Sequence, residues 1–204
     1  ADADVSTEDS KKHLKNQHQL IVNAIKKAGF DYADRIYHTN PRAHGPLAIS
    51  QHNMEWVTEG ALNFINQNAD KPFYLYYSIT PPHGPNDGWK EDPKATPVGI
   101  LEKVPSIGTE RSTILSRLDE YNVHKSKADI LWIDDNIRVI IKKLKDKKIL
   151  DNTIIVYVSD HGVESGKTTV YQGGLKTVGF FWAKNITGGR APEALCSTVD
   201  FVPT

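Results

Sequence analysis

Residues 151–162 read DNTIIVYVSDHG and carry the clearest fold signal in the chain. A polar turn precedes the continuous apolar run 154–158, a pattern typical of a buried strand. The run leads directly to Asp160 and His161. In parallel α/β sheets, ligands bind beyond the carboxyl ends of the strands. We therefore expect these two side chains to belong to a functional site.

A second run of this kind lies upstream, where residues 71–83 read KPFYLYYSITPPH. Its stretch 73–79 is short, aromatic and continuous, which predicts another buried strand. It ends close to His83, which stands between Pro82 and Gly84. A histidine placed there suits a general acid near neutral pH. The alternative is a loop histidine that makes a structural hydrogen bond.

The rest of the chain alternates helices with short strands. Helical spacing and capping residues predict four helices, which run from Thr7 to about Gly29 and over 53–67, 111–121 and 127–148. Further strands are predicted at 32–37 and 178–182, and a long ordered loop at 84–109. This order indicates an α/β fold with a mostly parallel sheet flanked by helices. Parallel strands would bring His83 and the pair Asp160 and His161 to one edge.

Composition narrows the classes of function. The 204 residues hold 25 Lys and Arg against 25 Asp and Glu, so nothing indicates a general nucleic-acid binder. No apolar run approaches the roughly 20 residues that a membrane span needs. The one cysteine, Cys196, excludes a disulfide scaffold and a zinc site with several thiolates. Its apolar neighbour Leu195 predicts a small core residue rather than a nucleophile.

Several other polar residues are candidates for binding or catalysis. A carboxylate and an imidazole are both metal ligands, so Asp160 and His161 form a candidate metal pair; alternatively, Asp160 caps a turn and His161 is exposed. Lys167 lies in a glycine-rich stretch, but three residues rather than four separate its glycines, which argues against a nucleotide P-loop. It remains a cation able to hold an anionic group.

The pair Asp134 and Asp135 is predicted to be exposed, because adjacent helix positions point about 100° apart. The histidines His38, His44 and His52 are given no role.

Four blocks in fixed order together resemble the type I sulfatases, formylglycine-dependent enzymes of the alkaline-phosphatase-like superfamily. They are 71–83, 151–162, 166–174 with its YQGG turn, and 199–204, and the resemblance spans about 52–204. It implies that Asp160 and His161 ligate a divalent cation, usually Ca²⁺. It implies that Lys167 contacts the sulfate oxygens, and that His83 contacts the sulfate and protonates the leaving alcohol. The substrate would be a sulfated small molecule or glycan, and the protein an exported one (periplasmic, secreted or lysosomal).

The chain also departs from the sulfatase pattern. The nucleophile pattern C/S-x-P-x-R is absent, as are the paired metal aspartates that normally precede the matched region. We therefore expect residues 1–204 to be part of a single sulfatase catalytic domain that continues upstream, where the formylglycine would lie, and downstream. Such a piece is expected to be inactive alone, to bind Ca²⁺ weakly and to self-associate through an exposed sheet edge. The alternatives are a phosphate- or phosphonate-ester hydrolase of the same superfamily, or a non-catalytic binding protein on this scaffold.

Overall fold

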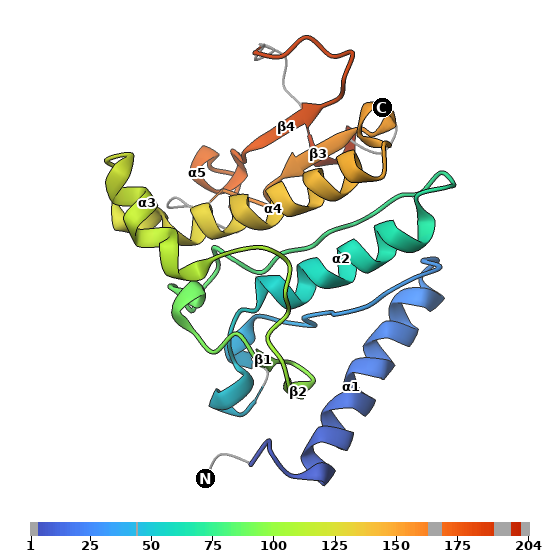
Figure 1. Ribbon diagram of the computed structural model, residues 1–204, viewed down its shortest axis with the longest axis vertical. Coiled ribbons are helices and arrows are strands. Elements are labelled where there is room, and N and C mark those ends of the chain that lie inside the picture. Colours follow the sequence, from blue (N-terminus) through green and yellow to red (C-terminus); the bar gives the residue numbers. More distant parts are fainter. Residues whose placement is uncertain (1–3, 44, 163–168, 190–196, 201–204) are drawn as a thin grey trace. The chain divides into compact units, whose positions relative to one another are not determined.

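The structure is a computed structural model that describes residues 4–43, 45–162, 169–189 and 197–200. The chain divides into two compact units, Ala1–Lys147 and Lys148–Thr204 (Figure 1). Short 3₁₀ turns connect the longer elements; they are Pro41–Ala43, Leu47–Ile49, Gly88–Lys90, Arg111–Thr113, Lys125–Lys127, Leu150–Asn152 and Thr198–Asp200. Among the described residues, no helix is both long enough and apolar enough to cross a membrane.

The first helix follows its capping signals. Helix α1 spans Glu8–Lys27, and the Thr7 side chain accepts a hydrogen bond from the Ser10 backbone N–H at 3.2 Å. Acidic residues in its first turn and lysines in its last turn complement the helix dipole. Gly29 then takes φ +111°, a conformation that favours glycine and ends the helix. The predicted helix is confirmed.

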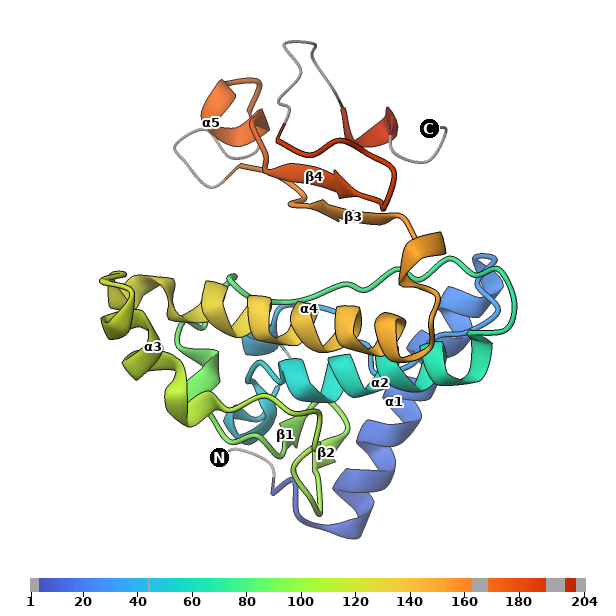
Figure 2. The same ribbon diagram turned by 45° about the horizontal axis from the view of Figure 1, so that its top comes forward.

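The other three helices of the first unit share one core. They are α2, Met54–Asn68; α3, Ile114–Glu120; and α4, Ala128–Asp146. Helices α2 and α4 run side by side (Figures 1 and 2). The buried cluster between these elements consists of Met54, Trp89, Ile114, Leu118, Ala128, Trp132 and Ile133. All three helices were predicted, because apolar residues recur along them at helical spacing.

The long loop is pinned to the start of α2. Asn53 caps α2 through its side-chain oxygen, which accepts from the Trp56 N–H at 3.0 Å. Its amide nitrogen donates to the carbonyls of Pro93 and Ala95, at 2.8 and 3.0 Å. These bonds fix a small antiparallel hairpin, β1 at Ala95–Thr96 and β2 at Gly99–Ile100. The region predicted as one long loop therefore contains a short ladder.

Segment 73–79 belongs to neither of the two β-ladders. Tyr77 and Ile79 pack against the core, whereas Tyr74 and Tyr76 are 67% and 68% exposed. The Tyr77 hydroxyl lies 2.6 Å from Thr58 Oγ1, and burial raises the pKa of this phenol. The prediction of a buried strand is wrong for these residues, because only one face of the segment is covered. The strand predicted at 32–37 is likewise not found.

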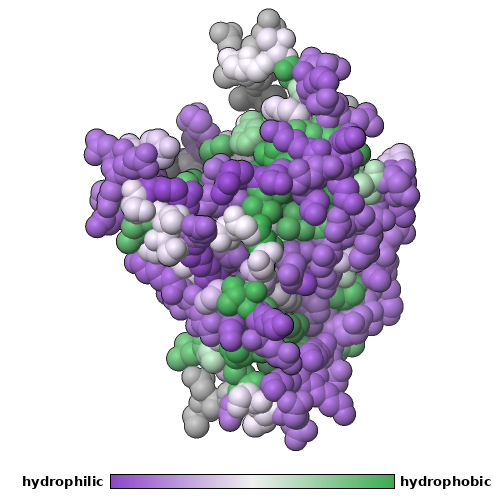
Figure 3. All heavy atoms as spheres, viewed as in Figure 1, coloured by the Kyte–Doolittle hydropathy of each residue, from purple (hydrophilic) through white to green (hydrophobic). Residues whose placement is uncertain are grey.

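The second unit contains one described ladder. Strand β3, Ile155–Val158, pairs antiparallel with β4, Gly179–Trp182, and the rings of Tyr157 and Phe180 stack 5.1 Å apart. Helix α5 is short, Gln172–Leu175. Both strands were predicted, but β3 is not buried: Val156 is 41% exposed, and hydrophobic residues show at the surface where β3 and β4 lie (Figure 3). Both ladders in the described part of the chain are antiparallel, so the predicted mostly parallel sheet is not confirmed by them.

Buried ion pairs join elements that lie far apart in sequence. Glu55, 3% exposed, accepts hydrogen bonds from Arg111 Nε at 3.1 Å and from Trp132 Nε1 at 2.7 Å. The Arg111 guanidinium also lies 4.5 Å from the Trp132 ring centre. Asp135 is 2% exposed and accepts from Arg117 Nη1 at 2.8 Å. The prediction that Asp135 is a surface residue is therefore wrong, because a distant arginine neutralises it inside the unit.

Replacing Arg111 with methionine should leave the Glu55 carboxylate buried without its cation. We expect this to destabilise the first unit by about 3–5 kcal/mol. The control is Lys142→Met, which removes an exposed pair with Asp146 and should cost less than about 1 kcal/mol. Urea unfolding followed by tryptophan fluorescence measures both. Equal small losses in the two variants would contradict a structural role for the buried pair.

Candidate functional site

His83 lies in the turn that follows the extended segment 73–79, and its side chain is exposed. The flanking peptide bonds Pro81–Pro82 and Gly84–Pro85 are cis. His83 Nδ1 is 3.0 Å from the Gly84 carbonyl, and Nε2 is 3.3 Å from Asn40 Nδ2. Since a carbonyl only accepts, Nδ1 carries the proton and Nε2 accepts from the Asn40 amide. The exposed Nε2 is thus the atom that can receive and return a proton.

His52 holds this turn through two hydrogen bonds, a role that no pattern in the sequence predicted. Its ring is 1% exposed; Nε2 lies 2.7 Å from the His83 carbonyl oxygen and Nδ1 lies 2.6 Å from Thr80 Oγ1. Nε2–H therefore donates to His83, and the Thr80 hydroxyl donates to Nδ1. Burial lowers the pKa of this imidazole below its ordinary value. His52 is a neutral anchor for the turn that carries His83.

Gly88 allows the loop to pass close to that anchor. A Cβ at this position would lie 2.9 Å from His52 Cβ and 3.1 Å from the Trp132 ring. Both contacts are tighter than ordinary packing permits. The loop after His83 is also tied to α4, because Asp129 Oδ2 accepts from the Asp87 N–H at 3.0 Å.

In the second unit, Asp160 and His161 follow β3 as predicted. Asp160 Oδ1 accepts from the His161 backbone N–H at 3.0 Å, and His161 Nδ1 lies 2.7 Å from the Gly162 carbonyl. Nδ1 thus donates, which leaves the lone pair of Nε2 facing Asp160 Oδ2 at 3.3 Å. Two electron-rich atoms this close could contact one cation together. The Asp160 side chain is 85% exposed, so its carboxylate is open to such an ion.

Close backbone packing sets the position of this pair. The Gly162 N–H donates to the Gly174 carbonyl at 2.9 Å, and a Cβ on Gly162 would lie 2.3 Å from the Gly173 oxygen. The ladder is extended on the other side, where Ser159 N–H donates to the Val178 carbonyl at 2.9 Å. The glycines of the YQGG turn therefore pack directly against the backbone of the Asp160–His161 turn and fix its position.

The residues present fit part of a metal site. Asp160 offers charged oxygen, and His161 offers an imidazole nitrogen whose other nitrogen is already hydrogen-bonded, as in many metal-binding histidines. Within the described ranges no group of three or more His, Cys, Asp or Glu side chains is placed to hold a metal ion.

The predicted sulfate-binding residue Lys167 lies outside the described residues. His83 belongs to the first unit and Asp160 to the second, so their predicted meeting at one edge stays a prediction.

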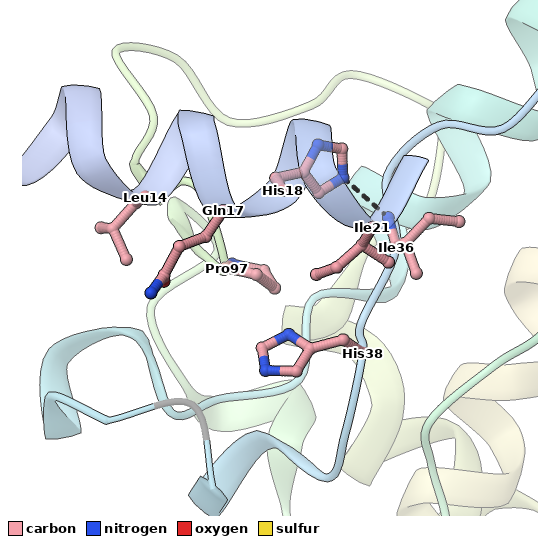
Figure 4. Close-up of a pocket in the computed structure, with 7 residues that line it drawn as sticks. All are labelled: Leu14, Gln17, His18, Ile21, Ile36, His38 and Pro97. Atoms are coloured by element: carbon pink, nitrogen blue, oxygen red, sulfur yellow. Dashed lines mark hydrogen bonds between the residues drawn. The ribbon is translucent and has the colours of Figure 1, made fainter. Parts of the chain in front are cut away.

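Figure 4 shows a narrow cavity at α1, lined by Leu14, Gln17, His18, Ile21, Ile36, His38 and Pro97. Its volume of about 10 Å³ holds little more than one water molecule. His18 Nε2 accepts from the Ile36 backbone N–H at 3.1 Å, and burial lowers the pKa of this histidine. This cavity is too small for a substrate, and His18 serves to attach segment 31–37 to α1.

Comparison with known proteins gives one family. The family model described as Sulfatase matches residues 5–204. An ulvan-active sulfatase of Formosa agariphila is 33% identical over 141 residues, which are 68% of this chain and 26% of that protein. Human N-acetylgalactosamine-6-sulfatase is 26% identical over 161 residues, 71% of this chain and 26% of that protein. The extracellular sulfatase SULF-1 homolog of Drosophila melanogaster is 27% identical over 209 residues, 92% of this chain and 18% of that protein. The chain thus spans about a quarter or less of the length of these relatives.

The neutral anchor predicts how stability depends on pH. His52 and His18 both have a pKa below the ordinary 6.5, so the unfolded chain takes up protons first as the pH falls. Stability should therefore be full above about pH 6.5 and fall below it, by at most about 1.4 kcal/mol per pH unit for each histidine. His52→Gln, which keeps a donor for the His83 carbonyl, should reduce the loss between about pH 7.5 and 5.5. The exposed His13→Gln should leave it unchanged. An unaltered loss in His52→Gln would contradict the assignment.

Adding a methyl group at Gly162 should displace the Asp160–His161 turn. The new Cβ would strike two backbone oxygens, those of Gly173 and Lys176, so we expect a loss of about 2–3 kcal/mol or more in the second unit. Gly188→Ala is the control, because a Cβ there meets nothing within 4 Å. Amide hydrogen exchange along β3 measures the effect. Unchanged protection in Gly162→Ala would show that the backbone contacts are not required.

Proposed function

Because the chain belongs to the sulfatase family, whose model matches residues 5–204, we propose that the whole protein hydrolyses sulfate esters. The observation that carries this proposal is the Asp160–His161 turn, in which a carboxylate and an imidazole lone pair lie 3.3 Å apart at the end of β3. Such a pair suits one side of a cation-assisted site for an anionic substrate. The names of the relatives, an ulvan-active sulfatase and an N-acetylgalactosamine-6-sulfatase, support a sulfated saccharide as the substrate.

Each residue has a proposed task in this reaction. Asp160 and His161 would hold a divalent cation, weakly in this chain alone, because Asp160 is the one carboxylate of this pair; a bound cation would supply charge stabilisation for the sulfate oxygens. Lys167 would bind the sulfate as a cation. His83, with Nε2 exposed and its turn held by His52, would return a proton to the leaving alcohol. A formylglycine would supply the nucleophilic oxygen, and no pattern for it occurs in these 204 residues.

The proposal extends to the domain organisation of the protein, its export and its self-association. Since the family model crosses both units, we place them in one catalytic domain with the mostly parallel, alkaline-phosphatase-like sheet that the sequence predicts. The name of the extracellular SULF-1 homolog supports an exported protein. The exposed apolar side chains of β3 and β4 support self-association of this chain at high concentration.

Hydrolysis of 4-nitrophenyl sulfate by the whole protein tests the activity, with 4-nitrophenyl phosphate in parallel. We expect the sulfate ester to be preferred. His83→Ala and Asp160→Asn should each lower turnover by at least about 100-fold, since both remove a group that acts on the reacting atoms. Lys142→Gln, an exposed residue of α4, is the control and should leave turnover unchanged.

The outcomes separate the alternatives. Preference for the phosphate ester would indicate a phosphatase of the same superfamily, and full activity in Asp160→Asn would remove the metal site from the reaction. The 204-residue chain by itself should show no turnover, because nothing else in the site replaces a nucleophile. Turnover of the chain alone that Lys167→Ala abolishes would contradict this part of the proposal.

A further inference from the structure

The Asn40 side chain faces His83 from a different part of the first unit. Its amide nitrogen Nδ2 lies 3.3 Å from His83 Nε2, the atom proposed to return a proton to the leaving alcohol. The two residues are 43 positions apart in sequence, and both side chains are exposed. The Asn40 amide makes no other hydrogen bond to a residue that the structure describes. Any substrate atom that reaches Nε2 therefore meets this amide.

The backbone at Asn40 is held in place although its side chain is exposed. The next residue, Pro41, is fully buried, and the Asn40 carbonyl accepts from the Ala43 N–H at 2.9 Å. Upstream, the Tyr37 hydroxyl donates to the Gln51 carbonyl at 2.8 Å. The segment that carries the amide is thus attached just before α2, where the buried imidazole anchor of the neighbouring turn also lies.

The backbone and the ring of His83 are equally constrained. Its N–H donates to the Thr80 carbonyl at 3.2 Å, and its own carbonyl accepts from the buried His52 ring at 2.7 Å. Ring Nδ1 donates to the Gly84 carbonyl at 3.0 Å. In a neutral ring, a proton on Nδ1 leaves a lone pair on Nε2, so the group that faces Nε2 must be a donor. The NH₂ group of Asn40 meets this requirement.

An amide can remain the partner of Nε2 when the ring gains a proton. An imidazolium ring carries N–H groups at both nitrogens, so Nε2 then needs an acceptor. A half-turn of the exposed Asn40 amide brings its oxygen to the place of its nitrogen, because the two groups are similar in size and shape. A carboxylate could only accept, and an ammonium group could only donate. Asparagine is therefore suited to hold the His83 ring in one orientation in both of its protonation states.

We propose that Asn40 is a positioning residue for His83, and that its amide holds Nε2 in one place while this nitrogen gains a proton from solvent and loses it to the leaving alcohol. The inference rests on the proposed function, because it concerns the same proton transfer. When the nucleophile bonds to sulfur and the ester S–O bond breaks, the electron pair stays on the leaving oxygen, which takes the proton from Nε2. The ring is then neutral again, and the Asn40 NH₂ group again donates to Nε2.

Titration of the 204-residue chain, labelled with ¹⁵N at histidine, tests the contact by NMR. At high pH, His83 Nδ1 should appear as an N–H nitrogen and Nε2 as an unprotonated one. Asn40→Asp places an acceptor-only carboxylate at Nε2, so Nε2 should gain its proton at a pH about one unit higher than in the parent chain. His52, the other titratable side chain in contact with this turn among the described residues, is followed in the same spectra.

The matched control for the added charge is Asn63→Asp. Asn63 is an exposed residue of α2, about 13 Å along the helix from Met54, at which distance salt screens much of the charge. This variant should leave the ring signals of His83 unchanged.

Turnover of 4-nitrophenyl sulfate by the whole protein tests the role of the contact. Asn40→Ala removes the partner of Nε2 but leaves the His83 ring, so kcat should fall by about tenfold while KM changes by less than about twofold. Asn63→Ala should match the parent protein in both constants.

Three results would overturn the proposal. An unchanged titration in Asn40→Asp would show that the amide does not contact Nε2 in solution, and an equal shift in Asn63→Asp would indicate a general charge effect. Parental kcat in Asn40→Ala would show that the contact plays no part in proton transfer. The titration requires neither metal nor turnover, so its failure leaves sulfate-ester hydrolysis standing, whereas failure of the hydrolysis proposal would appear as an inactive parent protein.

Discussion

The turn that carries His83 depends on buried and half-buried side chains supplied by other parts of the first unit. His52, at the start of α2, donates to the His83 carbonyl, and Asp129, in the first turn of α4, accepts from the loop at Asp87. Arg111 donates to the Glu91 carbonyl at 3.0 Å while it neutralises Glu55 in the core. The His83 ring itself is exposed, so this framework and the ring's own bonds to the Gly84 carbonyl and the Asn40 amide define where Nε2 lies. Buried polar groups are costly to leave unpaired, which makes the framework resistant to displacement.

In the second unit, the candidate site residues are positioned by backbone packing. Its candidate metal pair, an exposed Asp160 and a half-buried His161, is held by backbone contacts rather than by a buried network, and Gly162 packs against the glycines of α5. Glycine is required at 162 because the opposing carbonyl oxygens leave no room for a side chain. The group proposed to donate a proton and the groups proposed to bind a cation thus come from separate units, each with its own support.

Features fixed by local sequence were predicted well. The cap Thr7 and the apolar spacing of α2 and α4 predicted helices close to the observed bounds, and the apolar run before Asp160 predicted β3. Features that depend on distant partners were not. His52 contacts a loop 31 residues away, Asp135 pairs with an arginine 18 residues away, and Glu55 pairs with one 56 residues away. Segment 73–79 shows the same limit. Its apolar run predicts burial on both faces, but only one face is covered in the structure. Which face is covered, and which strand pairs with the segment, depends on distant residues and not on the run itself.

We propose that His83 and the Asp160–His161 pair act on one bound group, and a paramagnetic ion provides the test. Mn²⁺ can replace a divalent cation bound by carboxylate and imidazole, and it broadens the NMR signals of nearby protons with a steep dependence on distance. In the 204-residue chain, low Mn²⁺ should broaden the ring signals of His161 and His83 together and leave those of His13 sharp, and Asp160→Asn should abolish the effect. Broadening of His161 with His83 unaffected would show that the two groups do not share a site.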